Sequence, residues 1–202
     1  MGISVQQYEQ ITARLKGRPV RAGADPGPGA RRQLRGARTI LGIDPSLRGT
    51  GYGIIRTGTA PAATLAQGTI SCPKDWARSR CLAKISQTLR DLVLAHRPEV
   101  CVVEGLFFAQ NLKTAIIMGE ARGAALSAVA ESGLEIYEIA TRKVKLAIVG
   151  YGAAQKIAVA KMVQRMLGLA ELPAPDAADA LALALVLAEE QGRFSLRPPQ
   201  QI

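Results

Sequence analysis

The chain has 202 residues, 48% of them hydrophobic, which suits one domain of ordinary size with an appendage. No apolar run is long enough to span a bilayer, so we expect a soluble protein. The three cysteines, Cys72, Cys81 and Cys101, lack CxxC spacing, which argues against a disulfide framework or a zinc site and fits a reducing compartment. The formal net charge of +10 indicates a polyanionic partner, with nucleic acid the first candidate.

Residues 1–38 read as a separate basic segment. They hold 8 Lys and Arg against 2 Asp and Glu, and residues 21–32 are rich in Pro and Gly. This composition predicts a flexible N-terminal extension, followed by a globular domain over 39–190 and a C-terminal tail over 191–202. The extension either adds non-specific affinity for a polyanion or is incidental.

From residue 39 onward the hydrophobic pattern is that of a folded domain. Apolar runs bounded by Gly- or Pro-containing turns predict five strands, over 39–44, 50–57, 62–71, 100–104 and 134–140. Helical periodicity and Pro or Gly at the ends predict five helices, over 74–96, 111–131, 142–149, 153–168 and 176–190. This order predicts an α/β fold, with a mixed five-stranded sheet flanked by helices.

Two of the predicted strands end in a carboxylate. Asp44 follows an apolar run and precedes Pro45, which cannot continue a strand, and Glu104 ends a second apolar run. If these strands are neighbours, both side chains emerge at one edge of the sheet. The last helix begins with Asp176 and Asp179, which are three residues apart and so share a helix face.

Four converging acids would repel one another strongly unless a cation lay between them. Oxygen-only donors indicate Mg²⁺ or Mn²⁺ rather than zinc, and two such ions suit phosphodiester hydrolysis. The only histidine, His96, lies far along the chain from every acid and is not expected to act as a base. Taken singly, Asp44 is also explained by an Asp-Pro turn, and Asp176 by its place near the positive end of a helix.

In this order and spacing, the residues resemble the RuvC family of Holliday-junction resolvases over about 39–188. The segments that carry the resemblance are 41–53, 103–108, 111–123, 149–156 and 176–181. The resemblance implies an RNase H-like fold. The four metal-binding acids of the family match Asp44, Glu104, Asp176 and Asp179.

The resemblance further implies a homodimer of the bacterial cytoplasm that makes paired symmetric nicks in four-way junction DNA, in recombination and repair. It implies two Mg²⁺ ions per active site, with Mn²⁺ as a substitute, and raises the branch-migration proteins RuvA and RuvB as candidate partners. Phe107 matches an aromatic that stacks on bases at the crossover, and Phe108 lies beside it. Lys145 and Lys156 match lysines along the DNA path, with Lys143 as a helper. Core packing for a phenylalanine, and a solvated face for the lysines, are the simpler explanations.

The chain also departs from the family pattern. Gly105 stands where the family has glutamine, no histidine lies near the last acids, and residues 1–38 precede the first strand. The segment around Asp44 also resembles the first phosphate loop of actin-like ATPases, but a second Gly-rich phosphate loop is not visible. A closer alternative is another RNase H-like nuclease, acting on RNA or an RNA/DNA hybrid with the same acids. A junction-binding protein without catalysis is a third, which the presence of all four acids disfavours.

Overall fold

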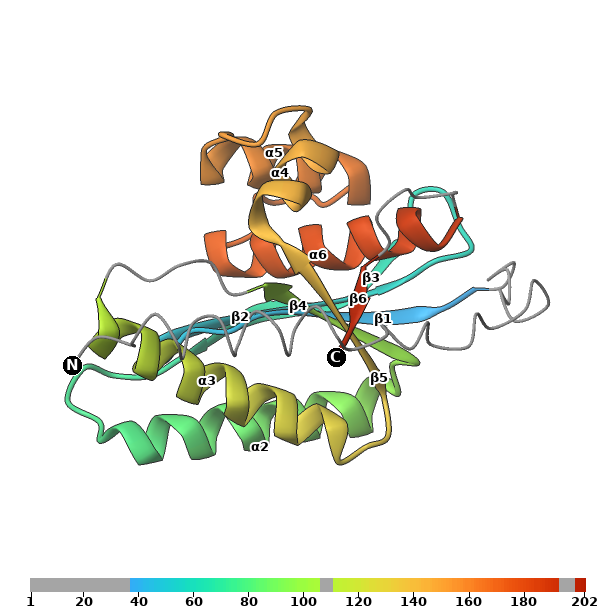
Figure 1. The fold of residues 1–202 in the computed structure, drawn as a ribbon. Helices are drawn as coiled ribbons and strands as arrows, with labels where there is room; N and C mark the ends of the chain where they lie inside the picture. The colour runs from blue at the N-terminus through green and yellow to red at the C-terminus, as the bar shows by residue number, and fades with distance from the viewer. Residues whose placement is uncertain (1–36, 106–110, 193–198) are drawn as a thin grey trace, which may run out of the picture. The chain divides into compact units, whose positions relative to one another are not determined.

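The structure is a computed structural model that describes residues 37–105, 111–192 and 199–202 (Figure 1). Most of the predicted basic extension, and Phe107 and Phe108, lie outside the described residues. The strands are β1 (Thr39–Asp44), β2 (Gly49–Arg56), β3 (Ala63–Ser71), β4 (Val100–Gly105), β5 (Glu135–Ala140) and β6 (Gln200–Gln201). The helices are α2 (Arg78–His96), α3 (Leu112–Ala130), α4 (Thr141–Val149), α5 (Lys156–Leu167) and α6 (Pro175–Gly192). Among these described helices, none is both long and apolar enough to cross a membrane.

The strands form one mixed sheet in the order β3-β2-β1-β4-β5-β6. β1, β2 and β3 pair as an antiparallel meander, while β4 lies parallel to β1 and to β5. The predicted α/β fold with a mixed sheet is therefore confirmed. The sixth strand was not predicted, because Gln200 and Gln201 are too few and too polar to give a strand pattern; they pair antiparallel with β5.

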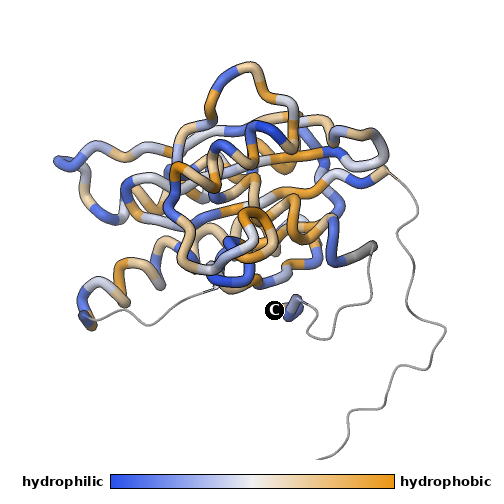
Figure 2. The backbone as a smooth tube through the Cα atoms, turned by 90° about the horizontal axis from the view of Figure 1, so that it is seen from above, coloured by the Kyte–Doolittle hydropathy of each residue, from blue (hydrophilic) through white to orange (hydrophobic). Residues whose placement is uncertain are grey.

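Helices cover both faces of this sheet (Figure 1). Successive residues of a strand point to opposite faces, so the central strands are buried on both sides. On one face Ile40 and Val102 pack with α4, α5 and α6, and on the other Leu41 and Ile43 pack with α2 and α3. Figure 2 shows the matching concentration of hydrophobic residues in the interior of the domain.

Helix α6 lies unusually close to β1 and β2, because glycines face it. A Cβ added at Gly42 would lie 2.0 Å from the main-chain oxygen of Ala180, and one at Gly51 would lie 2.0 Å from that of Asp176. No side chain larger than hydrogen fits at either position. The glycines therefore let the first turns of α6, which carry Asp176 and Asp179, rest directly on the strands.

Helix α2 begins at Arg78, four residues later than predicted. Residues 73–76 instead form a turn, in which the Trp76 amide donates to the Pro73 oxygen at 3.2 Å. The Arg48 guanidinium donates to the main-chain oxygens of Pro73 and Trp76. These long-range bonds hold the turn outside the helix, and local sequence signals do not reveal them.

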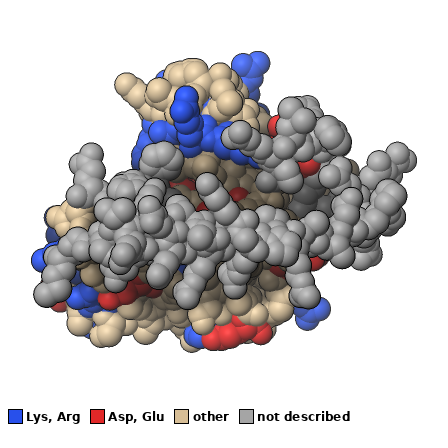
Figure 3. Space-filling model, viewed as in Figure 1, with Lys and Arg blue, Asp and Glu red and all other residues tan. Residues whose placement is uncertain are grey.

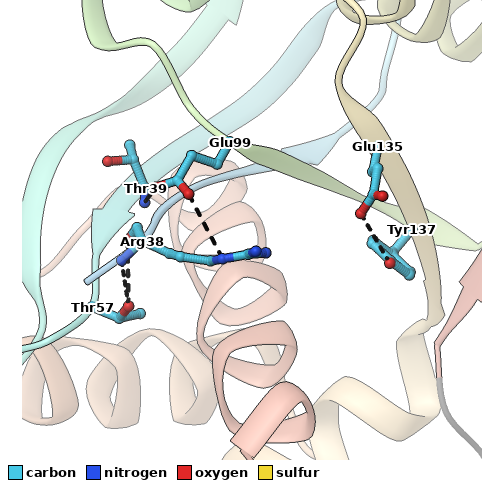
Figure 4. A network of polar contacts seen from close by, with 6 residues as sticks. All are labelled: Arg38, Thr39, Thr57, Glu99, Glu135 and Tyr137. Atoms are coloured by element: carbon cyan, nitrogen blue, oxygen red, sulfur yellow. Dashed lines mark hydrogen bonds and ion pairs between the residues drawn. The ribbon is translucent and has the colours of Figure 1, made fainter. Parts of the chain in front are cut away.

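Polar contacts at the first residues of β1, at the other end of the strand from Asp44, fix where this strand begins (Figure 4). The Arg38 amide donates to Thr57 Oγ1 at 2.9 Å, and the Thr39 amide donates to Glu99 Oε1 at 3.2 Å. The Arg38 guanidinium also pairs with Glu99 at 3.7 Å. These contacts hold the first residues of β1 between the neighbouring strands. Asp44, the last residue of β1, therefore lies at the opposite edge of the sheet.

Candidate active site

Asp44 and Glu104 come together because their strands are parallel neighbours. Ile43 lies opposite Val103, so the two acids that follow emerge at the same edge of the sheet. Their side chains are hydrogen-bonded to each other. Burial, and next the charge of Glu104, raise the pKa of Asp44 from 3.8 to about 8. Asp44 therefore carries a proton over much of the range below pH 8 in the metal-free protein.

Glu104 is held by two residues that were not among the predicted site residues. Thr141 Oγ1 donates a hydrogen bond of 2.6 Å to Glu104 Oε1. Arg122, which is buried, donates to the main-chain oxygen of Glu104 and to the carboxylate of Glu138. The one sequence feature that could have indicated Arg122 is its position as a charged residue inside a predicted helix rich in Ala and Gly. Nothing local distinguished Thr141.

Asp176 and Asp179 lie in the first turns of α6 and face Lys156, the first residue of α5. Lys156 Nζ is 2.9 Å from Asp179 Oδ2 and 3.8 Å from Asp176 Oδ1. Burial raises the pKa of Asp179, and the hydrogen bond from Lys156 opposes the rise without cancelling it. Burial lowers the pKa of Lys156, but the bond to Asp179 and the nearby carboxylates outweigh burial and raise it. Lys156 thus places a positive charge among these acids.

The four acids, from β1, β4 and α6, share one site. Asp44 is influenced by the charges of Glu104 and Asp179, and Asp179 by those of Glu104 and Asp176. Among the described residues, no three such side chains already stand as a metal-binding cluster. Lys156 instead contacts Asp176 and Asp179, and Asp44 interacts with Glu104.

The donor set itself fits a hard divalent cation. All four side chains offer carboxylate oxygens, which are the donors that Mg²⁺ and Mn²⁺ prefer. Burial first, and then the neighbouring carboxylates, raise the pKa of Asp44, and a bound cation would favour the charged form of this acid. Lys156, which contacts one oxygen of Asp179 and approaches one of Asp176, would compete with a cation for these two carboxylates.

The predicted lysines lie in different places. Lys145 is four residues after Thr141 on α4, so it shares a helix face with the residue that bonds Glu104. Lys143 instead pairs with Glu190 at 2.8 Å, near the C-terminal end of α6 and away from the acids in its first turns. Figure 3 shows basic side chains on the side of α4 and α5 that faces the sheet, above a few acidic side chains.

The strand order and the helix placement define an α/β domain of the RNase H-like class, with carboxylates at one edge of the sheet. The family profile described as "Crossover junction endodeoxyribonuclease RuvC" matches residues 40–187. The chain therefore belongs to the RuvC family of crossover junction endodeoxyribonucleases, which are phosphodiester hydrolases.

Individual relatives agree with this assignment. The RuvC of Akkermansia muciniphila is 45% identical over 146 residues, which cover 72% of this chain and 87% of that protein. The RuvC of Coxiella burnetii is 46% identical over 148 residues, covering 73% and 86%. The structure is also similar to Thermus thermophilus RuvC in complex with a Holliday junction substrate, with a TM-score of 0.74, 31% identity, and coverage of 82% of this chain and 99% of that one.

Proposed function

We propose that this chain resolves four-way (Holliday) junctions by paired symmetric nicks, in homologous recombination and DNA repair. The observation that carries the proposal is the convergence of Asp44, Glu104, Asp176 and Asp179 at one sheet edge in a member of the RuvC family. The similarity to a family structure solved with a Holliday junction substrate supports the choice of substrate.

In this proposal the four acids hold two Mg²⁺ ions, with Mn²⁺ as a substitute. When bound, such ions supply the Lewis-acid chemistry of phosphodiester hydrolysis. The Thr141 hydroxyl orients the Glu104 carboxylate, and the Arg122 guanidinium fixes the main chain beneath it. Lys156 leaves the aspartates and places its charge beside a DNA phosphate, so that the positive charge is kept at the site.

Further residues contact the DNA on either side of the cut. Lys145 and Lys156 neutralise phosphates, which makes binding salt-sensitive. Phe107 stacks on an unpaired base at the crossover, a contact worth about 1–3 kcal/mol, and Phe108 supports it. Lys143, which the family resemblance implies as a helper of these lysines, is paired with Glu190 and contacts DNA where the DNA extends along α4.

The proposed enzyme is a homodimer, because paired nicks need two active sites. The exposed face of α3 supports this assembly. Leu112 and Ile116 are 78% and 51% exposed, and a Cβ at Gly119 or Gly123 would meet nothing within 4 Å. These positions recur at helical spacing and form an apolar stripe that a second copy can cover.

Family membership alone supports two further parts of the proposal, namely the bacterial cytoplasm as the place of action and the branch-migration proteins RuvA and RuvB as partners. The basic segment 1–38 adds non-specific affinity for DNA through its excess of Lys and Arg.

A cleavage assay on three labelled substrates tests the substrate class. The substrates are a mobile four-way DNA junction, a linear duplex of the same arms and an RNA/DNA hybrid, each with Mg²⁺. We expect paired nicks in the junction alone. Cutting of the hybrid instead would keep the fold and the site but would assign the protein to another branch of RNase H-like nucleases.

A further inference from the structure

A second group of basic side chains lies on the other side of the acids from α4 and α5. We call it the β3–α2 rim; it consists of four cations around Trp76, namely Arg48, Lys74, Arg80 and Lys84. It surrounds the turn between the end of β3 and the start of α2. None of these four cations is among the DNA-contacting residues described above.

The main chain that carries Arg48 lies beside one of the four acids. Gly49, next to Arg48, pairs with Ser71 at the end of β3, and the Cys72 amide donates to the Arg48 main-chain oxygen at 3.1 Å. A Cβ added at Gly49 would lie 2.9 Å from Asp176 Oδ2. The Asp176 carboxylate therefore lies between this strand end and Lys156, which approaches it to 3.8 Å.

The charge of the rim is positive and largely uncompensated. Arg48 and residues 74–84 include five Lys and Arg but only one acid, Asp75. Glu120 pairs with Arg78 at 3.0 Å, whereas Lys74, Arg80 and Lys84 form no ion pair with a described carboxylate. No acidic residue lies in the first turn of α2 to reduce this charge. A polyanion is the partner that such a surface fits.

The rim is also held in place before any ligand binds. The Arg80 guanidinium stacks on Trp76, 3.7 Å from the ring centroid, and Lys84 Nζ is 5.3 Å from the same centroid. Lys84 donates to the Ser71 oxygen at 2.7 Å, and Arg48 donates to the Trp76 oxygen at 3.2 Å. Cations with restricted side chains lose less conformational entropy when they meet a phosphate.

We propose that the β3–α2 rim is a second contact surface for the DNA backbone. It holds a duplex arm of the junction on the side of the acids opposite to Lys145 and Lys156. The inference rests on the proposed function, since it places the scissile strand between two basic surfaces. An acidic protein is the alternative ligand for the same basic surface, and the test below distinguishes DNA from such a protein.

Fluorescence anisotropy with a labelled four-way junction in Ca²⁺, measured over a series of salt concentrations, tests the rim. The rim variant is Lys74→Gln/Arg80→Gln, whose two side chains lie on exposed residues. The control is Arg56→Gln/Arg165→Gln, which removes two cations from exposed residues outside the rim: Arg56 ends β2 and Arg165 is in the last turn of α5.

The logarithm of affinity falls with the logarithm of salt concentration by about 0.9 per phosphate neutralised. We therefore expect the rim variant to reduce the slope by about 2 and to weaken binding by about tenfold or more near physiological salt, where the control changes little. We also expect that shortening the junction arms will weaken junction binding by the wild-type protein more than junction binding by the rim variant.

A rim variant with the slope and affinity of the wild type, while the wild type binds and cuts the junction, would overturn the inference and leave the proposed function intact. That result would also be expected if the rim served a protein partner. A wild-type protein that neither bound nor cut the junction would instead overturn the proposed function. Equal losses in the rim variant and the control would show only a general charge effect, and would also overturn the inference.

Discussion

The Thr141 hydroxyl donates a hydrogen bond of 2.6 Å to the Glu104 carboxylate, which links the first residue of α4 to the end of β4. Strand pairing places the main chain of Glu104 beside that of Ile139, but it leaves the carboxylate free to rotate. Thr141 follows directly after β5, so the chain that pairs with β4 also delivers the group that orients its acid. The geometry of the site thus depends on a residue that carries no charge.

Replacement of Thr141 by valine should weaken divalent cation binding. Valine has nearly the same shape but donates no hydrogen bond, and a bond to a charged acceptor is worth about 1.5–3 kcal/mol. We expect the affinity for Mn²⁺, measured by calorimetry or electron paramagnetic resonance, to fall by about tenfold or more. Thr141→Ser should restore most of it. A valine variant that bound Mn²⁺ like the wild type would show that the hydroxyl does not position Glu104.

Replacement of Lys156 by glutamine should affect metal binding and cleavage in opposite directions. Without DNA the Lys156 ammonium competes with a cation for Asp176 and Asp179, and an exposed ion pair is worth about 0–1 kcal/mol. We therefore expect Mn²⁺ to bind up to about fivefold more tightly, while junction cleavage falls because a phosphate contact is lost. Lys161→Gln, on the same helix at an exposed position, is the control. Unchanged Mn²⁺ affinity in Lys156→Gln would contradict the competition.

The raised pKa of Asp44 should make the stability of the metal-free protein depend on pH. In the folded protein Asp44 keeps its proton up to about pH 8, whereas in the unfolded chain it loses it near 3.8. Between these values the folded state binds the extra proton, so the free energy of unfolding falls as the pH rises. Asp179, whose pKa is also raised, acts in the same direction.

Thermal unfolding in EDTA at several pH values between 4 and 8 measures this effect. The melting temperature of the wild type should be lower at the upper end of that pH range than at the lower end. In Asp44→Asn the melting temperature should fall less over the same range. If the melting temperature of Asp44→Asn fell with pH as much as that of the wild type, the pH dependence would come from groups other than Asp44.

Replacement of Ile116 by arginine should disrupt the proposed dimer. Ile116 is 51% exposed on the face of α3 that also carries Leu112, so the fold should tolerate the change. A buried unpaired charge at an interface costs several kcal/mol, enough to shift a dimer to monomers. Light scattering after size exclusion should report a monomer, with Leu94→Arg, at an exposed position on α2, as the control. A dimeric Ile116→Arg variant would place the interface elsewhere.

The sequence predicted the elements that position the site better than it predicted the side chains around it. Hydrophobic periodicity located the strands that end in Asp44 and Glu104, and spacing placed Asp176 and Asp179 on one helix face. These signals are local. The close approach of α6 at Gly42, and the contacts that Arg122, Thr141 and Lys156 make, join residues far apart in sequence. No local pattern encodes such contacts. The late start of α2 was missed for the same reason, because it depends on the long-range bond from Arg48 to the Trp76 oxygen.

The central claim is that the acids at one edge of the sheet cut the junction, and Asp44→Asn tests it most directly. Wild-type and variant protein would be compared with Mg²⁺ on a junction labelled in turn on each strand, with binding measured in parallel by gel shift. The account predicts symmetric nicks in two opposed strands by the wild type, and no nicks but retained junction binding by the variant. Cleavage by Asp44→Asn at the wild-type rate would contradict the assignment of the site.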